Sequence, residues 1–152
     1  MLINSPKEFA ALFPLYARVM GLDVGEKTMG VAMSDAMRSI AVPLETIERK
    51  KFAQDMKHLK EIIQKYAVEG ILIGYPINMD GSLGPRAQSM RTFVSNLEKH
   101  FNLPMILWDE RMSTMAVERA MLEADLSRAR RAQLVDKLAA SYMLQGFLDN
   151  IK

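Results

Sequence analysis

The 152-residue chain contains no cysteine, which excludes disulfide bonds and metal sites built from thiolates. Long apolar runs are also missing: the longest have the length of a strand, so the sequence predicts no membrane span. No basic-then-apolar leader pattern opens the chain, so a cytoplasmic protein is expected. The formal net charge of +2 is too small to indicate a nucleic-acid partner by itself. With 49% hydrophobic residues, the chain is predicted to bury one core.

The most informative segment spans residues 19–35, VMGLDVGEKTMGVAMSD. An apolar run that contains one carboxylate, Asp23, is followed by Gly25, and a second apolar run follows Gly30. This pattern is typical of two strands joined by a tight turn. An acid inside an apolar strand costs free energy unless a metal ion or a phosphate-bearing ligand lies beside it. The alternative is an aspartate at a strand end that caps the following turn.

Hydrophobic periodicity predicts the other elements, beginning with a capped helix over about residues 6–13. The expected strands are residues 19–24, 29–33, 40–47, 71–74 and 105–108. The later helices are expected at residues 52–66, 90–101, 114–123 and 129–149. Three strands followed by alternating helices and strands predict an α/β fold, in which a mixed sheet has helices on both faces. Pro43 lacks an amide donor, so its strand is expected at a sheet edge.

Two further sets of acids are candidates for the same site. Asp109 and Glu110 follow the last strand, and ligands of such sheets bind where strands end. Asp136 lies in the C-terminal helix among alanines, and a face of small side chains allows a helix to approach the sheet closely. A solvent-facing Asp136 beside Arg131 is an equal alternative.

Carboxylates that converge from separate elements suit hard divalent cations such as Mg²⁺ or Mn²⁺. Two such ions about 4 Å apart can activate water and stabilise the leaving oxygen in phosphodiester hydrolysis. Without metal, the clustered carboxylates would repel one another. The pattern therefore predicts a metal site made by Asp23, Asp109, Glu110 and Asp136.

Four blocks of the chain, in order, resemble the YqgF family, also called RuvX, of the RNase H-like superfamily. They are GLDVGEKTMGVAMSD at residues 21–35, ILIGYPINMDGSLGPRA at 71–87, WDERMST at 108–114 and VDKLAASYMLQGFLD at 135–149. The resemblance implies a five-stranded RNase H-like sheet in the order 3-2-1-4-5. It also implies a nuclease domain over residues 18–152, after an N-terminal helical extension over residues 1–17. That extension is expected to cover a sheet edge or to pack on a helix.

The resemblance implies that Asp23, Glu110 and Asp136 are catalytic. Either Asp109 or Glu110 could bind metal; the longer reach of Glu110 favours it, and Asp109 could instead cap the turn. Lys27 and Arg111 are candidate phosphate contacts. Lys27 could equally be a solvated turn residue, and Arg111 could pair with Asp109.

The family is associated with 5′-end trimming of precursor 16S rRNA, which implies RNA in a pre-ribosomal particle as the partner. It has also been proposed to resolve Holliday junctions, a reaction that would need two active sites. A monomer or a weak dimer is expected. Two other classes stay open: an actin-like phosphotransferase, which needs two such domains, and a non-catalytic binding module, which would leave the acids unexplained.

Overall fold

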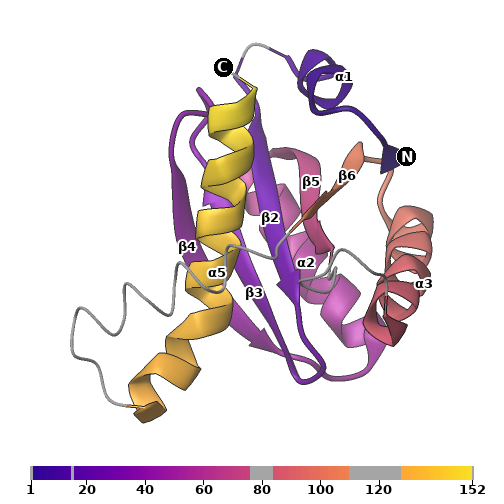
Figure 1. The fold of residues 1–152 in the computed structure, drawn as a ribbon. Coiled ribbons are helices and arrows are strands. Elements are labelled where there is room, and N and C mark those ends of the chain that lie inside the picture. The colour runs from indigo at the N-terminus through magenta and orange to yellow at the C-terminus, as the bar shows by residue number, and fades with distance from the viewer. Residues whose placement is uncertain (1, 15, 76–83, 110–127, 152) are drawn as a thin grey trace.

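The computed structural model describes residues 2–14, 16–75, 84–109 and 128–151, with the backbone alone for residues 86 and 128–137. Within them, one mixed sheet has the strand order β1-β6-β5-β2-β3-β4 (Figure 1). In chain order the strands are β1 (Leu2–Ile3), β2 (Arg18–Val24), β3 (Thr28–Ser34), β4 (Ala41–Glu48), β5 (Val68–Tyr75) and β6 (Met105–Asp109). The β2–β3 and β3–β4 pairs are antiparallel, and β5 is parallel to both of its neighbours.

Helices cover both faces of this sheet. They are α1 (Pro6–Ala11), α2 (Phe52–Tyr66), α3 (Pro85–His100) and α5 (Arg128–Asn150). Figure 1 shows α5 in front of the sheet and α2 behind it. The helix expected over residues 114–123, and the break expected at residues 125–127, lie outside the described residues. No helix in the described ranges is long and apolar enough to span a bilayer.

The expected α/β class and strand order are confirmed. The order 3-2-1-4-5 corresponds to β4-β3-β2-β5-β6, and Pro43 does lie in an edge strand, β4. The hydrogen-bonding pattern explains this placement, because an edge strand tolerates a residue without an amide donor.

A sixth strand, which the periodicity did not reveal, extends the sheet at its other edge. β1 pairs in parallel with β6, with Leu2 opposite Met105. The adjoining helix α1 is capped by Ser5, whose side chain accepts a hydrogen bond from the amide of Glu8. Phe9 of α1 packs edge-on against Phe147 of α5, with ring centroids 5.5 Å apart. The extension therefore both covers a sheet edge and packs on a helix, whereas its division from the rest at residue 17 stays a prediction.

The alternation of side chains along the strands divides the apolar core in two. One part lies between the sheet and helices α2 and α3, and includes Met20, Leu22, Ile73 and Leu97. The other lies under α5 and α1. Along β2, each face of the sheet therefore belongs to a different core, which decides where an acid on that strand can point.

Candidate functional site

Asp23 lies near the end of β2, on the face that α5 covers. Leu22 and Val24 on either side of it belong to the α2–α3 core, whereas Val19 packs in the core under α5. Since successive side chains of a strand point to opposite faces, Asp23 shares the face of Val19. It is half-buried there.

Glycines surround Asp23 in the sheet. Gly30 is its partner on β3, and the pairing of Leu22 with Ile73 brings Gly74 of β5 alongside it. Neither neighbour has a side chain, so neither of these two positions places one beside the carboxylate. The strand neighbours of Asp23 therefore do not themselves obstruct a ligand.

Gly21 allows α5 to approach this part of the sheet closely. A Cβ atom on Gly21 would lie 3.2 Å from Cβ of Leu144 and 3.5 Å from the carbonyl oxygen of Ala140. Figure 1 shows that α5 runs against the direction of β2. Residue 136 precedes Ala140 by one helical turn, so the backbone of α5 leads from Gly21 toward the end of β2 that carries Asp23. The Asp136 side chain lies outside the described part of the structure.

Asp109 lies at the same end of the sheet, but on the other face. It is the last residue of β6, is exposed and pairs in register with Tyr75. Met105 and Leu107, four and two positions earlier, pack in the α2–α3 core. By alternation Asp109 shares their face, opposite to Asp23. Glu110, Arg111 and residues 78–83 of the long connection lie outside the described residues.

The described acids do not form a metal cluster by themselves. Among the residues that the structure describes, no group of three or more His, Asp or Glu side chains is placed to hold a metal ion. That statement does not cover two of the four predicted ligands, because Glu110 and the Asp136 side chain are not described. The metal site therefore stays a prediction.

Lys27 lies exposed in the turn between β2 and β3. Two backbone hydrogen bonds hold this turn: the amide of Gly25 donates to the carbonyl of Thr28 over 2.8 Å, and the amide of Arg49 donates to the carbonyl of Lys27, also over 2.8 Å. The turn places Lys27 four residues after Asp23. Its contact with phosphate stays a prediction.

Two arginine contacts near this end of the sheet were not predicted from the sequence. Arg91 of α3 donates from Nε to the hydroxyl oxygen of Tyr75 over 2.9 Å, beside Asp109 in the register. Arg49 is the first residue of a basic run that continues with Lys50 and Lys51, and it donates from Nη1 to the carbonyl of Gly25. For the contact between Arg91 and Tyr75, the sequence signal is an aromatic residue at the end of a strand.

Asp35 shows how the chain satisfies an acid with its own backbone. Its Oδ1 accepts hydrogen bonds from the amides of Ser39 at 2.7 Å and Ile40 at 3.0 Å. These bonds, with that of Ile40 the largest influence, hold the pKa of Asp35 below its ordinary value. Asp35 is thus a structural acid of the β3–β4 turn.

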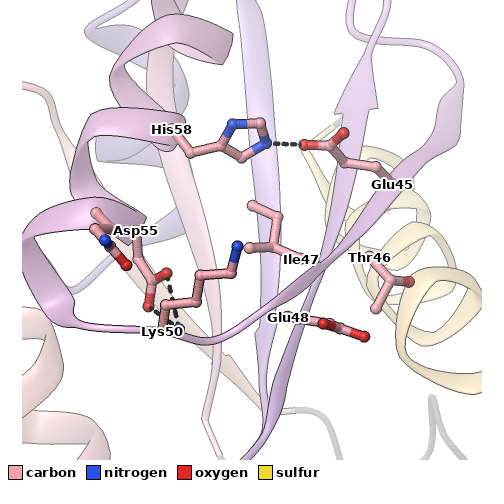
Figure 2. Close-up of a pocket in the computed structure, with 8 residues that line it drawn as sticks. Glu45, Thr46, Ile47, Glu48, Lys50, Asp55 and His58 are labelled. Atoms are coloured by element: carbon pink, nitrogen blue, oxygen red, sulfur yellow. Dashed lines mark hydrogen bonds and ion pairs between the residues drawn. The ribbon is translucent and has the colours of Figure 1, made fainter.

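The pocket in Figure 2, of about 350 Å³, lies between β4 and α2, on the face of the sheet opposite to Asp23. Figure 2 shows His58 of α2 and Glu45 of β4 pointing toward one another, with their Nε2 and Oε1 atoms 2.5 Å apart. Nearby, Asp55 accepts hydrogen bonds from the amide of Lys50. These charges are engaged in joining an edge strand to a helix, and none of the predicted site residues lines the pocket.

Comparison with known proteins gives a consistent result. The family model RuvX, described as "Holliday junction resolvase", matches residues 17–150. A protein of Rhodobacter capsulatus named "Putative pre-16S rRNA nuclease" is 54% identical over 151 residues, covering 99% of this chain and 95% of its own. A protein of the same name from Ruegeria sp. is 54% identical over 152 residues, covering 100% and 97%.

Solved structures share the fold at low sequence identity. Thermus thermophilus RuvC in complex with a Holliday junction substrate has a TM-score of 0.53 at 14% identity, covering 90% of this chain and 96% of its own. The fowlpox virus resolvase in complex with Holliday junction DNA has a TM-score of 0.51 at 10% identity, covering 88% and 98%. At this identity the likeness supports the RNase H-like fold alone.

Proposed function

Because the chain belongs to the RuvX family, and is therefore a nuclease, we propose that it trims the 5′ end of precursor 16S rRNA with the help of divalent metal. The observation that carries the metal proposal is the glycine-lined position of Asp23 on the face that α5 approaches at Gly21. The full-length relatives at 54% identity support the choice of RNA. Such processing would take place in the cytoplasm.

We assign the metal ligands to Asp23, Glu110 and Asp136. Asp109 is the weaker candidate because it shares the face of Met105 and Leu107 rather than that of Asp23. Oxygen ligands of this kind suit Mg²⁺ or Mn²⁺. When bound, the metal would supply activation of water and stabilisation of the leaving oxygen. The protein's own part is to hold the carboxylates on one face and to bind the RNA backbone through Lys27 and Arg111.

The substrate is proposed to be single-stranded or loosely paired RNA within an assembling ribosomal particle. Sequence-independent binding of nucleic acid scales with the number of phosphates that cationic side chains neutralise. A formal net charge of +2 allows few phosphate contacts, fewer than expected for a protein that binds four DNA arms. Low activity on naked RNA is therefore expected.

Resolution of Holliday junctions is the second candidate, because the matching family model carries that description. A resolvase cuts two strands symmetrically and so needs two active sites. A stable dimer in solution would favour this candidate, whereas a monomer or a weak dimer favours rRNA trimming.

The deciding experiment maps cleavage sites on precursor 16S rRNA and on a four-way DNA junction side by side. We expect Mg²⁺-dependent cuts near the rRNA 5′ end, lost in Asp136→Asn and kept in the matched control Asp149→Asn. Asp149 lies on the same helix, where it accepts a hydrogen bond from Gln145 at 3.0 Å. Symmetric paired nicks on the junction, together with normal 16S 5′ ends in cells depleted of the protein, would overturn the proposal in favour of the resolvase.

A further inference from the structure

Arg49 contacts the β2–β3 turn with both its backbone and its side chain. It lies in the short connection between β4 and α2, 24 residues from Gly25 in the sequence. Its amide donates to the carbonyl of Lys27 over 2.8 Å, and its Nη1 donates to the carbonyl of Gly25 over 2.5 Å. Two successive bonds from one residue therefore grip the turn that follows Asp23.

A third contact ties the same arginine to helix α3. Its Cζ atom lies 5.4 Å from the centroid of the Phe93 ring, within the range of a cation–π interaction. Phe93 is only 7% exposed, so it offers a fixed surface. Arg49, Gly25 and Phe93 also line a small pocket of about 120 Å³. The guanidinium thus links the turn to a rigid part of the core.

We propose that Arg49 is a positioning residue for the nuclease reaction, which holds the turn and thereby sets the positions of Asp23 and Lys27. The inference rests on the proposed function, in which Asp23 binds metal and Lys27 contacts phosphate. Asp23 is two residues before Gly25, so a shift of the turn carries over to its carboxylate. Lysine cannot replace Arg49, because it lacks the planar group that donates and stacks at the same time.

The same arginine could instead act as a simple phosphate contact, and the two roles give different kinetics. A lost phosphate contact weakens binding and lowers the slope of log affinity against log salt by about one. A lost positioning contact lowers kcat, because misplacement of about 1 Å can cost on the order of 100-fold in rate.

The test compares Arg49→Met and Arg49→Lys with the matched control Lys51→Met, whose exposed cation lies in the same basic run. We expect both Arg49 variants to lower kcat by about 10-fold to 100-fold. Their KM and salt slope should stay close to those of the unmodified protein, and Lys51→Met should keep its kcat. Amide hydrogen exchange, measured without metal or RNA, should speed up at Gly25 in both Arg49 variants.

The exchange measurement separates this inference from the proposed function, since it needs no substrate. Unchanged exchange at Gly25, or faster exchange with unchanged kcat, would overturn the positioning role. A reduced salt slope with unchanged kcat would assign Arg49 to phosphate contact instead. If the unmodified protein cleaves no nucleic acid, the proposed function fails while the exchange data still report on the turn. Should Arg49→Met not fold, Phe93→Leu removes the ring beneath the guanidinium and provides the same readouts.

Discussion

The two faces of strand β2 differ in what they carry and in what covers them. One face presents Met20, Leu22 and Val24, all buried against α2 and α3. The other presents Val19, Gly21 and Asp23, and in the described part of the chain it is covered by α5 and α1. The first face is built for packing, with large side chains at every position. On the second, Gly21 allows α5 to approach the strand closely two residues before Asp23.

The difference implies that substitutions on the two faces should have separate consequences. On the α2–α3 face they should change the free energy of unfolding with little specific effect on chemistry. At the Asp23 end of the α5 face they should change activity more than stability.

The largest effect is expected at Asp23. Asp23→Asn should lower metal-dependent cleavage at least about 100-fold, because one metal ligand loses its charge. The metal-free protein should be no less stable, since losing one of several like charges relieves repulsion on the order of 1 kcal/mol at a partly solvated site. Single-turnover cleavage and thermal unfolding in EDTA measure the two effects. Retained activity would show that Asp23 is not a central ligand, and a sharply lower Tm would assign it a structural hydrogen bond.

The next largest effect is expected at Leu22, which precedes Asp23 and points to the opposite face of β2. Leu22 is fully buried, and Leu22→Ala should lower the free energy of unfolding by about 2–5 kcal/mol through the cavity it leaves. Leu22→Met, which conserves volume, should cost less than about 1.5 kcal/mol. Urea denaturation measures both. A small loss in the alanine variant would mean that this face is loosely packed.

Gly21→Val tests the close approach of α5. The added Cβ would lie 3.2 Å from Cβ of Leu144, so the helix must move away from the sheet. We expect a loss of about 1–3 kcal/mol from overpacking. Cleavage should fall by more than the loss of folded protein explains, because residue 136 moves with the helix. Activity per folded molecule equal to that of the unmodified protein would contradict the role of α5 in the site.

Asp35 sharpens the contrast between an acid held by backbone amides and an acid proposed to hold metal. Its pKa is lowered in the folded protein, so the stability it contributes is present above its unfolded pKa and is lost as the pH falls through the folded value. Asp35→Ala should therefore lower the Tm by a few degrees at pH 7, and the difference should shrink below about pH 4. Thermal unfolding over a pH series measures it. A difference that does not change with pH would indicate that packing, not charge, is lost.

The smallest effect is expected on α5 itself. A Cβ atom on Gly146 would meet nothing within 4 Å, unlike one on Gly21. Gly146→Ala should stabilise the protein by about 0.5–1 kcal/mol, since glycine is a poor helix former. Chemical denaturation measures the gain, and cleavage should be unchanged. A destabilised variant would contradict the prediction, because it would mean that the added methyl group at Gly146 meets neighbouring atoms.

Five of the six strands and all four described helices could be predicted from the sequence. Hydrophobic periodicity is a local property, so the strands and helices could be found without knowing their partners. Pro43 identified an edge strand through its missing amide, and an acid in an apolar run singled out Asp23. The family resemblance added the strand order. Periodicity, the missing amide of Pro43 and the acid at Asp23 each depend on chemistry within a few residues, whereas the strand order came from the resemblance.

Which acids share a face, and which residues hold them, depends on how distant segments pack. Alternation along β6 shows that Asp109 and Leu107 share a face of the sheet. It does not show which helix covers that face, because the covering helices come from distant parts of the chain. The bonds from Arg49 to Gly25 and the pairing of β1 with β6 likewise join residues far apart in sequence. No local pattern encodes such contacts. They arise when the packed sheet brings distant segments together, and in this chain that packing determines how Asp23 is placed.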